Sequence, residues 1–211
     1  MLLKVFTALL LVVSSAQAAN RPGKIPGERP SAKPAEVVSE KLNKLNETLA
    51  GEYSIQTRLA EPKNMDSKEA ESFSVRVEEL HKVINENSSK LSDPAFKLKL
   101  SGMMDSYNGA LEARSTFKES AKAFKTGSPE ASAAKEILEL IDNGTRIMES
   151  KITESSDAMV SESMIMVTFN KIAEGVKSPT LSAKEVLETK KAVEQLFARE
   201  GWTLYDIARC R

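Results

Sequence analysis

The sequence predicts an all-α protein, an antiparallel bundle of about five helices that includes one long helix and a short C-terminal helix. Two observations support this prediction. From residue 34 onward, apolar residues recur every three or four positions, the spacing that gives a helix one buried face. Glycine and proline are scarce after residue 62, while alanine, leucine, lysine and glutamate are abundant, and this composition favours helices over strands.

The first eighteen residues have the pattern of a cleaved signal peptide. Lys4 gives a short positive start, an apolar run follows, and Ala16-Gln17-Ala18 is a small-residue cleavage site. The apolar run is shorter than the roughly 20 residues that a transmembrane helix needs. We therefore expect an exported chain that does not span the membrane and that is periplasmic or secreted.

Residues 19–33 are rich in proline and glycine and carry few apolar side chains, which predicts a flexible tether. Residues 34–211 are expected to form a single domain, long enough to bury a hydrophobic core. The chain carries 30 basic and 30 acidic side chains. With no excess of basic charge, we expect no nucleic-acid partner.

Local signals set the expected bounds of the first two helices. The apolar spacing predicts a helix over 34–60, ended by Pro62, with an alternating strand over 53–59 as the alternative. Asp66 followed by Glu69 is a capping pair, in which each residue satisfies a backbone N–H of the other. It predicts a second helix that ends near residue 87.

The middle of the chain predicts two helices, the second of them long. An Asp-Pro pair at 93–94 opens a helix that we expect to close at Gly127. From there an unbroken heptad phase predicts a single helix over about 130–176, with coiled-coil character. Asn143 and Gly144 offer an alternative, a break at this point that would give a more compact bundle.

The last helix has the strongest start signal in the chain. Ser182 and Glu185 form a capping box, and Gly201 is the expected end. The tail that follows carries Cys210, the only cysteine, so an intramolecular disulfide is excluded. Its thiol could join two copies of the chain, which makes a homodimer a further expectation.

His81 is the only histidine, which excludes a Ser-His-Asp triad and a site with several histidine ligands. It lies at the edge of an apolar helix face, where we expect an ordinary boundary side chain. The alternative is a haem held inside the bundle by His81 and a methionine such as Met103. Methionine at helical spacing is more often core filler, so we predict no cofactor and no metal.

Arg114 occupies an apolar position of its helix, and a buried charge needs a partner. If the helices on either side of Gly127 form an antiparallel hairpin, Arg114 faces Leu140, with Glu139 and Asp142 within reach. We predict a structural ion pair there. Two alternatives remain, an extended side chain that reaches solvent and an arginine that binds a carboxylate or phosphate ligand.

Three Asn-x-Ser/Thr sequons could accept a glycan if the source is eukaryotic. They begin at Asn46, Asn87 and Asn143. Asn46 falls inside an expected helix, which makes it the least suited of the three as an acceptor.

The sequence has no phosphate-binding glycine loop, no Cys-x-x-Cys pair and no zinc-protease motif, so we expect that the protein is not an enzyme. The leading interpretation is a non-catalytic interaction module for an envelope protein or cell-wall component. It rests on apolar residues outside the main helix faces, which would form a docking surface: Val37, Ile55, Met104, Leu111, Ile147 and Ile165. The alternative is a carrier of a small molecule or cofactor near His81, the methionines or Arg114.

Overall fold

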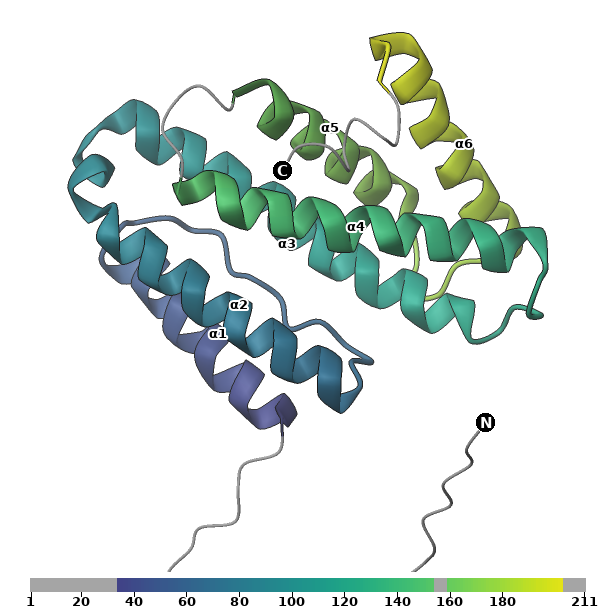
Figure 1. Cartoon of the computed structure of the whole chain (residues 1–211), viewed down its shortest axis with the longest axis horizontal. Helices are drawn as coiled ribbons and strands as arrows, with labels where there is room; N and C mark the ends of the chain where they lie inside the picture. Colours follow the sequence, from purple (N-terminus) through teal and green to yellow (C-terminus); the bar gives the residue numbers. More distant parts are fainter. Residues whose placement is uncertain (1–33, 154–158, 203–211) are drawn as a thin grey trace, which may run out of the picture. The chain divides into compact units, whose positions relative to one another are not determined.

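The computed structural model describes residues 34–153 and 159–202, except for the side chains of 151–153 and 159–162. The described residues form α-helices and one 3-10 turn, with no strand among them, which confirms the all-α fold class (Figure 1). The predicted signal peptide, the predicted tether and Cys210 lie outside them. The helices are α1 (Pro34–Gly51), α2 (Ser67–Glu86), η1 (Ser88–Ser92), α3 (Pro94–Ala121), α4 (Pro129–Thr153), α5 (Met159–Gly175) and α6 (Ala183–Glu200).

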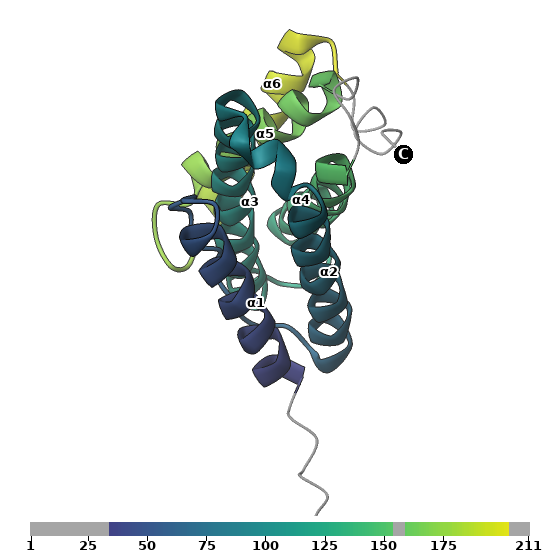
Figure 2. The ribbon, with the colours of Figure 1, turned by 90° about the vertical axis from the view of Figure 1, so that its left-hand side faces the viewer.

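Four of the helices form a closed ring of contacts. α3 packs against α4 and α5, and α6 packs against the same two helices. The α1–α2 hairpin lies beside the α3–α4 pair, with α2 in contact with α4 (Figures 1 and 2). This arrangement brings polar side chains of α2, α3 and α4 to a common seam.

The predicted capping boxes are both present. Asp66 accepts a hydrogen bond from the N–H of Glu69 at 2.8 Å, and the Glu69 carboxylate accepts one from the N–H of Asp66 at 2.8 Å. Ser182 and Glu185 make the same exchange at the start of α6. Gly201 ends α6 with φ of 69°, a left-handed conformation that glycine adopts at little cost.

The third helix begins as predicted and ends early. The Asp93 carboxylate accepts a hydrogen bond from the N–H of Ala95 at 2.9 Å, with Pro94 as the first helical residue. α3 ends at Ala121 rather than at Gly127. Gly127 has φ of 81°, and it lies in the connection that reverses the chain into α4.

The prediction of a first helix over 34–60 is wrong at its C-terminal end, because α1 stops at Gly51. The chain from residue 52 to 66, called the extended segment below, has no regular secondary structure. Tyr53, Ile55 and Leu59 are buried, so the alternating pattern there arises from buried side chains and not from a strand. The Asn46 amide fixes this segment to α1: its Oδ1 accepts from the N–H of Leu59 at 2.8 Å and its Nδ2 donates to the Leu59 carbonyl at 3.1 Å. A glycan on Asn46 would break that pair.

The extended segment also binds α3. The N–H of Ala60 donates to Asn108 Oδ1 at 2.6 Å, and the N–H of Lys63 donates to Ser115 Oγ at 2.9 Å. Thr57 donates a further hydrogen bond to Asp105. Side chains of α3 therefore satisfy backbone groups that a continued α1 helix would have satisfied internally.

The prediction of one long helix over 130–176 is also wrong. α4 ends at Thr153, α5 begins at Met159, and the two helices pack against each other. A Cβ at Gly144 would lie 2.7 Å from two ring carbons of Phe169. In one straight helix these residues would be about 37 Å apart, at 1.5 Å per residue. Asn143 and Gly144 do not break α4, which continues to Thr153.

The apolar residues expected to form a docking surface mostly belong to the core. Ile55, Met104, Leu111 and Ile165 are each at most 2% exposed. Of the other two, Val37 is half-buried and Ile147 packs against the core. Met104 and Leu111 are buried because α3 packs on α4 and α5 and also binds the extended segment, so it buries more than one face.

Candidate functional site

A cavity of about 220 Å³ lies between α2, α3 and α4, with part of its wall supplied by the extended segment. Its apolar lining consists of Pro62, Met65, Phe73 and Leu111, and all but Met65 are buried. Exposed residues from α2 and α4 form the mouth, namely Lys68, Ser72 and Arg146. The remaining lining residues are Glu69, Arg76, Arg114, Asp142 and Thr145.

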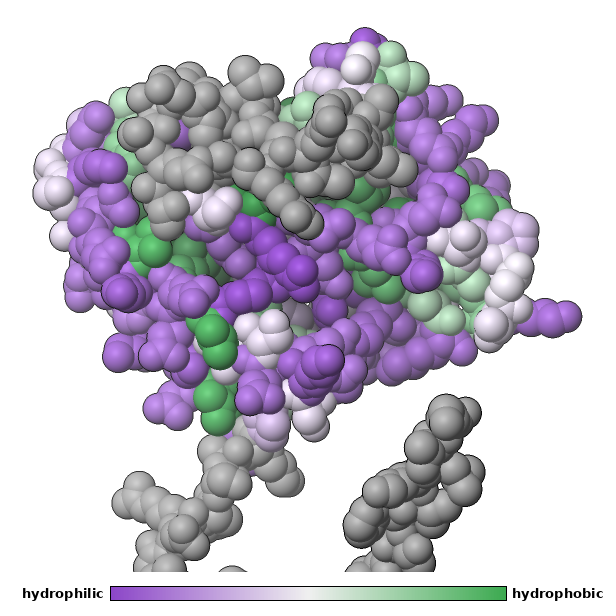
Figure 3. All heavy atoms as spheres, in the orientation of Figure 1, coloured by the Kyte–Doolittle hydropathy of each residue, from purple (hydrophilic) through white to green (hydrophobic). Residues whose placement is uncertain are grey.

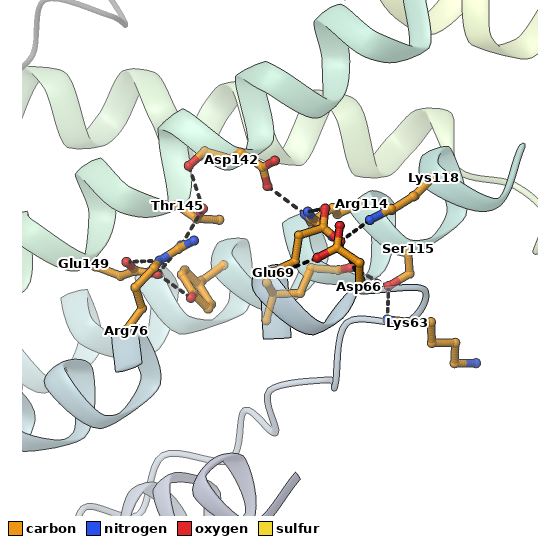
Figure 4. A network of polar contacts seen from close by, with 12 residues as sticks. Lys63, Asp66, Glu69, Arg76, Arg114, Ser115, Lys118, Asp142, Thr145 and Glu149 are labelled. Carbon is orange, nitrogen blue, oxygen red and sulfur yellow. Dashed lines mark hydrogen bonds and ion pairs between the residues drawn. The ribbon is translucent and has the colours of Figure 1, made fainter. Parts of the chain in front are cut away.

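Arg114 is held between two carboxylates from different helices (Figure 4). Its Nε donates to Asp142 Oδ1 at 2.7 Å and its Nη2 donates to Glu69 Oε1 at 3.2 Å. Lys118 donates to the other oxygen of Glu69. The Arg114 side chain is 12% exposed, and within the described residues its Nη1 is buried with no hydrogen-bond acceptor.

The sequence prediction for Arg114 is confirmed in part. Asp142 is its partner across the predicted α3–α4 hairpin, whereas Glu139 lies 3.7 Å from Lys135 on its own helix. Glu69 was not predicted as a partner, because it comes from α2 and no hairpin symmetry links the two positions.

A second network, which the sequence analysis missed, joins the same three helices. Arg76 of α2 donates from Nε and Nη2 to the two oxygens of Glu149, at 2.8 Å and 2.6 Å. Tyr107 of α3 donates its hydroxyl proton to Glu149 Oε1 at 2.6 Å. Arg76 Nη2 also donates to Thr145 Oγ1 at 2.9 Å, and its guanidinium carbon lies 5.7 Å from the centre of the Phe73 ring.

Two sequence signals pointed toward this second network without identifying it. Thr145 interrupts the apolar face of α4; it is 2% exposed, and its hydroxyl also donates to the Asp142 carbonyl at 3.1 Å. Tyr107 lies on the apolar face of α3, and a buried tyrosine hydroxyl usually has a polar partner. Neither signal indicates that Glu149 and Arg76 are the carboxylate and the cation of this network.

Burial and charge act against each other on these groups. Burial alone would lower the pKa of Arg76 and of Arg114, but the hydrogen bonds and charges of Glu149 and Asp142 respectively raise each pKa above its usual value. Burial, followed by the charge of Glu149, raises the pKa of Tyr107 well above its usual value. At neutral pH, the charged forms of Arg76 and Arg114 and the neutral form of Tyr107 are therefore strongly favoured.

Burial and neighbouring charges also have opposite effects on the pKa of Glu69, which is an acid. Partial burial would raise it, but hydrogen bonds from Lys118 and the Asp66 backbone, with the charges of Lys118 and Arg114, lower it overall. Glu69 is therefore ionised at neutral pH. Four cationic and two anionic side chains line the cavity, so its lining carries a net positive charge.

The other candidates lie away from this cavity. His81 Nε2 is 2.9 Å from Thr48 Oγ1, in the interface between α1 and α2, and burial with the nearby charge of Lys44 lowers the His81 pKa. Met103 is 2% exposed and belongs to the core. Neither residue lines the cavity, whereas Arg114 does. The possible intermolecular disulfide at Cys210 falls outside the described residues.

Within the described ranges, 34–153 and 159–202, no three His, Cys, Asp or Glu side chains are grouped so that they could hold a metal ion. The helices in the same ranges include none that is both long and apolar enough to cross a membrane.

Comparison with known protein families, with curated proteins and with solved structures finds no match to this chain. The geometry and charge of the cavity are therefore the features from which a function can be inferred.

Proposed function

We propose that this chain is an exported, non-catalytic binding protein that holds a small organic anion in the cavity between α2, α3 and α4. The observation that carries the proposal is Nη1 of Arg114, a buried donor on a charged group with no acceptor among the described residues. Leaving such a donor unpaired costs about 1–3 kcal/mol or more. An anionic ligand in the adjoining cavity would supply the acceptor.

The charge of the lining supports the same proposal. Of the four cations in the lining, Arg114 pairs with Asp142 and Glu69, and Arg76 pairs with Glu149. The other two, Lys68 and Arg146, are exposed at the mouth. Exposed cations at the entrance of a partly apolar cavity attract anions and raise their local concentration. Because the buried polar groups are engaged in ion pairs between helices, we infer binding without chemical conversion.

Docking onto an envelope protein or cell-wall component stays a prediction. The apolar residues that supported it no longer favour docking over ligand binding in the cavity. Four of the six residues on which it rested are in the core. Among the residues whose side chains are described, the exposed large apolar ones come from four different helices: Val75, Leu98, Val167 and Leu187. On the face drawn in Figure 3, hydrophilic side chains dominate and apolar ones form separate patches.

Replacing Arg114 with methionine should abolish anion binding while changing stability little. The two carboxylates that it releases are each about one-third exposed, so they can turn to solvent, and the unpaired Nη1 is removed. We expect small organic acids to raise the melting temperature of the wild-type protein, because a ligand that binds only the folded state stabilises it. The Arg114→Met variant should fold with a similar melting temperature and show no such increase.

The matched control is Lys190→Met. Lys190 also lies between two carboxylates, Glu136 at 2.9 Å and Glu194 at 3.5 Å, but it does not line the cavity. This variant should keep the full ligand-dependent increase in melting temperature. The proposal is wrong if no organic acid stabilises the wild-type protein, or if Arg114→Met and Lys190→Met respond equally.

A further inference from the structure

The lining of the cavity separates into a cationic part and an apolar part. Arg114 and Arg76 supply guanidinium groups, while Phe73 and Leu111 supply buried apolar surface, with Phe73 6% exposed and Leu111 2% exposed. Met65, which is partly buried, extends the apolar wall toward the surface. A ligand that satisfied only the cations would leave this apolar wall against water.

The ion pairs around Arg114 limit the charge of the ligand. Glu69 and Asp142 already hold Arg114 from two sides, at 3.2 Å and 2.7 Å. A second negative charge on the ligand would lie close to these carboxylates, in a partly buried setting where like charges repel strongly. Within the part of the chain that the structure describes, one guanidinium nitrogen of Arg114 has no partner, which suits a single carboxylate better than a phosphate that needs several donors.

A carboxylate that binds the end of the Arg114 guanidinium meets both Nη1, which has no acceptor among the described residues, and Nη2, which donates to Glu69. The Glu69 side chain is 32% exposed, and Lys118 and the Asp66 N–H also bind its carboxylate. Glu69 can therefore turn away from Arg114 while those two donors retain it. The ligand carboxylate would then accept from Nη1 and, in place of Glu69, from Nη2.

The size of the cavity limits the apolar part of the ligand. Its volume is about 220 Å³, whereas an apolar cavity of about 150 Å³ accepts benzene and drug-sized ligands occupy about 300–1,000 Å³. The space therefore suits one ring or a short branched chain together with a carboxylate.

We propose that the cavity between α2, α3 and α4 binds a monocarboxylate with a compact apolar body, such as a single aromatic ring. This inference rests on the proposed function and specifies its ligand class. The carboxylate binds Arg114 and the apolar body packs against Phe73 and Leu111.

Isothermal titration calorimetry with a matched set of probes tests the proposal. Phenylacetate has both a single carboxylate and an aromatic ring. Acetate lacks the ring, phenylacetamide lacks the negative charge, and phenylmalonate carries a second negative charge. Inorganic phosphate is the fifth probe. Phenylacetate should bind at least about tenfold more tightly than each of the others, the factor expected from burying a few ring carbons or satisfying one charge.

Two variants locate the binding site. Arg114→Met should abolish phenylacetate binding, and Ser72→Trp should also abolish it, because Ser72 is an exposed residue at the mouth where an indole would fill the entrance. Lys190→Met should bind phenylacetate like the wild type.

The outcomes separate the two proposals. Tighter binding of acetate or phenylmalonate than of phenylacetate, dependent on Arg114, would overturn this inference and leave the proposed function in place. Tighter binding of inorganic phosphate would overturn both, since the proposed ligand is an organic anion. Equal binding of phenylacetamide and phenylacetate would overturn both, since charge would play no part. The absence of binding by all five probes would also overturn both.

Discussion

Replacing Glu149 with leucine is expected to lower the free energy of unfolding by about 3 kcal/mol, the low end of the cost of breaking a buried ion pair. Glu149 accepts three hydrogen bonds, two from Arg76 and one from Tyr107. The side chains of Arg76 and Glu149 are only 18% and 13% exposed. Without the carboxylate, a buried cation and a buried hydroxyl would both lose their acceptor.

Urea denaturation of three variants checks this expectation. The double variant Arg76→Met/Glu149→Leu should recover most of the loss, because it removes the uncompensated charge as well. Glu136→Leu is the control: Glu136 is 39% exposed where it pairs with Lys190, and its loss should cost less than about 1 kcal/mol. A Glu149→Leu variant no less stable than Glu136→Leu would contradict the structural role of this network.

Replacing Gly144 with alanine is expected to destabilise the protein by about 1–2 kcal/mol, against the usual preference of helices for alanine. The new methyl group would lie 2.7 Å from Cε1 and Cζ of Phe169, a ring that is 1% exposed and has little room to move. The sign of the change in stability distinguishes two helices packed together from one continuous helix. A single straight helix over 130–176 would keep Phe169 far away, and alanine would then stabilise it by about 0.5–1 kcal/mol.

Gly102→Ala is the matched control, because it also lies inside a helix but its Cβ would meet only Met166 Cε at an ordinary 3.5 Å. It should be neutral or stabilising in thermal denaturation. Phe169→Leu should partly rescue Gly144→Ala by giving the methyl group space. A stabilised Gly144→Ala variant would exclude the packing of α5 onto α4.

Features that depend on neighbouring residues were predictable from the sequence. The capping boxes at Asp66 and Ser182 involve residues three apart, so their patterns report their geometry directly. The pairing of Arg114 with Asp142 was also accessible, because two helices joined by a short connection face each other at positions roughly equidistant from it. The position of the cavity depends on this hairpin.

Features that depend on packing between distant segments were not predictable. The α1 helix ends at Gly51, a residue type that is a local signal for a helix end and that the 34–60 prediction did not use. The binding of the following segment by Asn46 and side chains of α3 is a packing feature that no local pattern shows. The heptad phase persists across α4 and α5 because each helix needs an apolar face, whether the two are continuous or reversed. The Arg76–Glu149–Tyr107 network joins three helices whose mutual placement no periodicity encodes.

The central claim, that the cavity between α2, α3 and α4 binds a small organic anion, is tested most directly by an NMR titration. The isotopically labelled protein would be titrated with phenylacetate while backbone amide and arginine Nε–H signals are followed. We predict saturable shifts at the Arg114 Nε–H and at the amides of Phe73 and Leu111, which line the cavity. Shifts confined to other parts of the molecule, such as the α5–α6 surface around Val167 and Leu196, or no saturable shift at all, would contradict it.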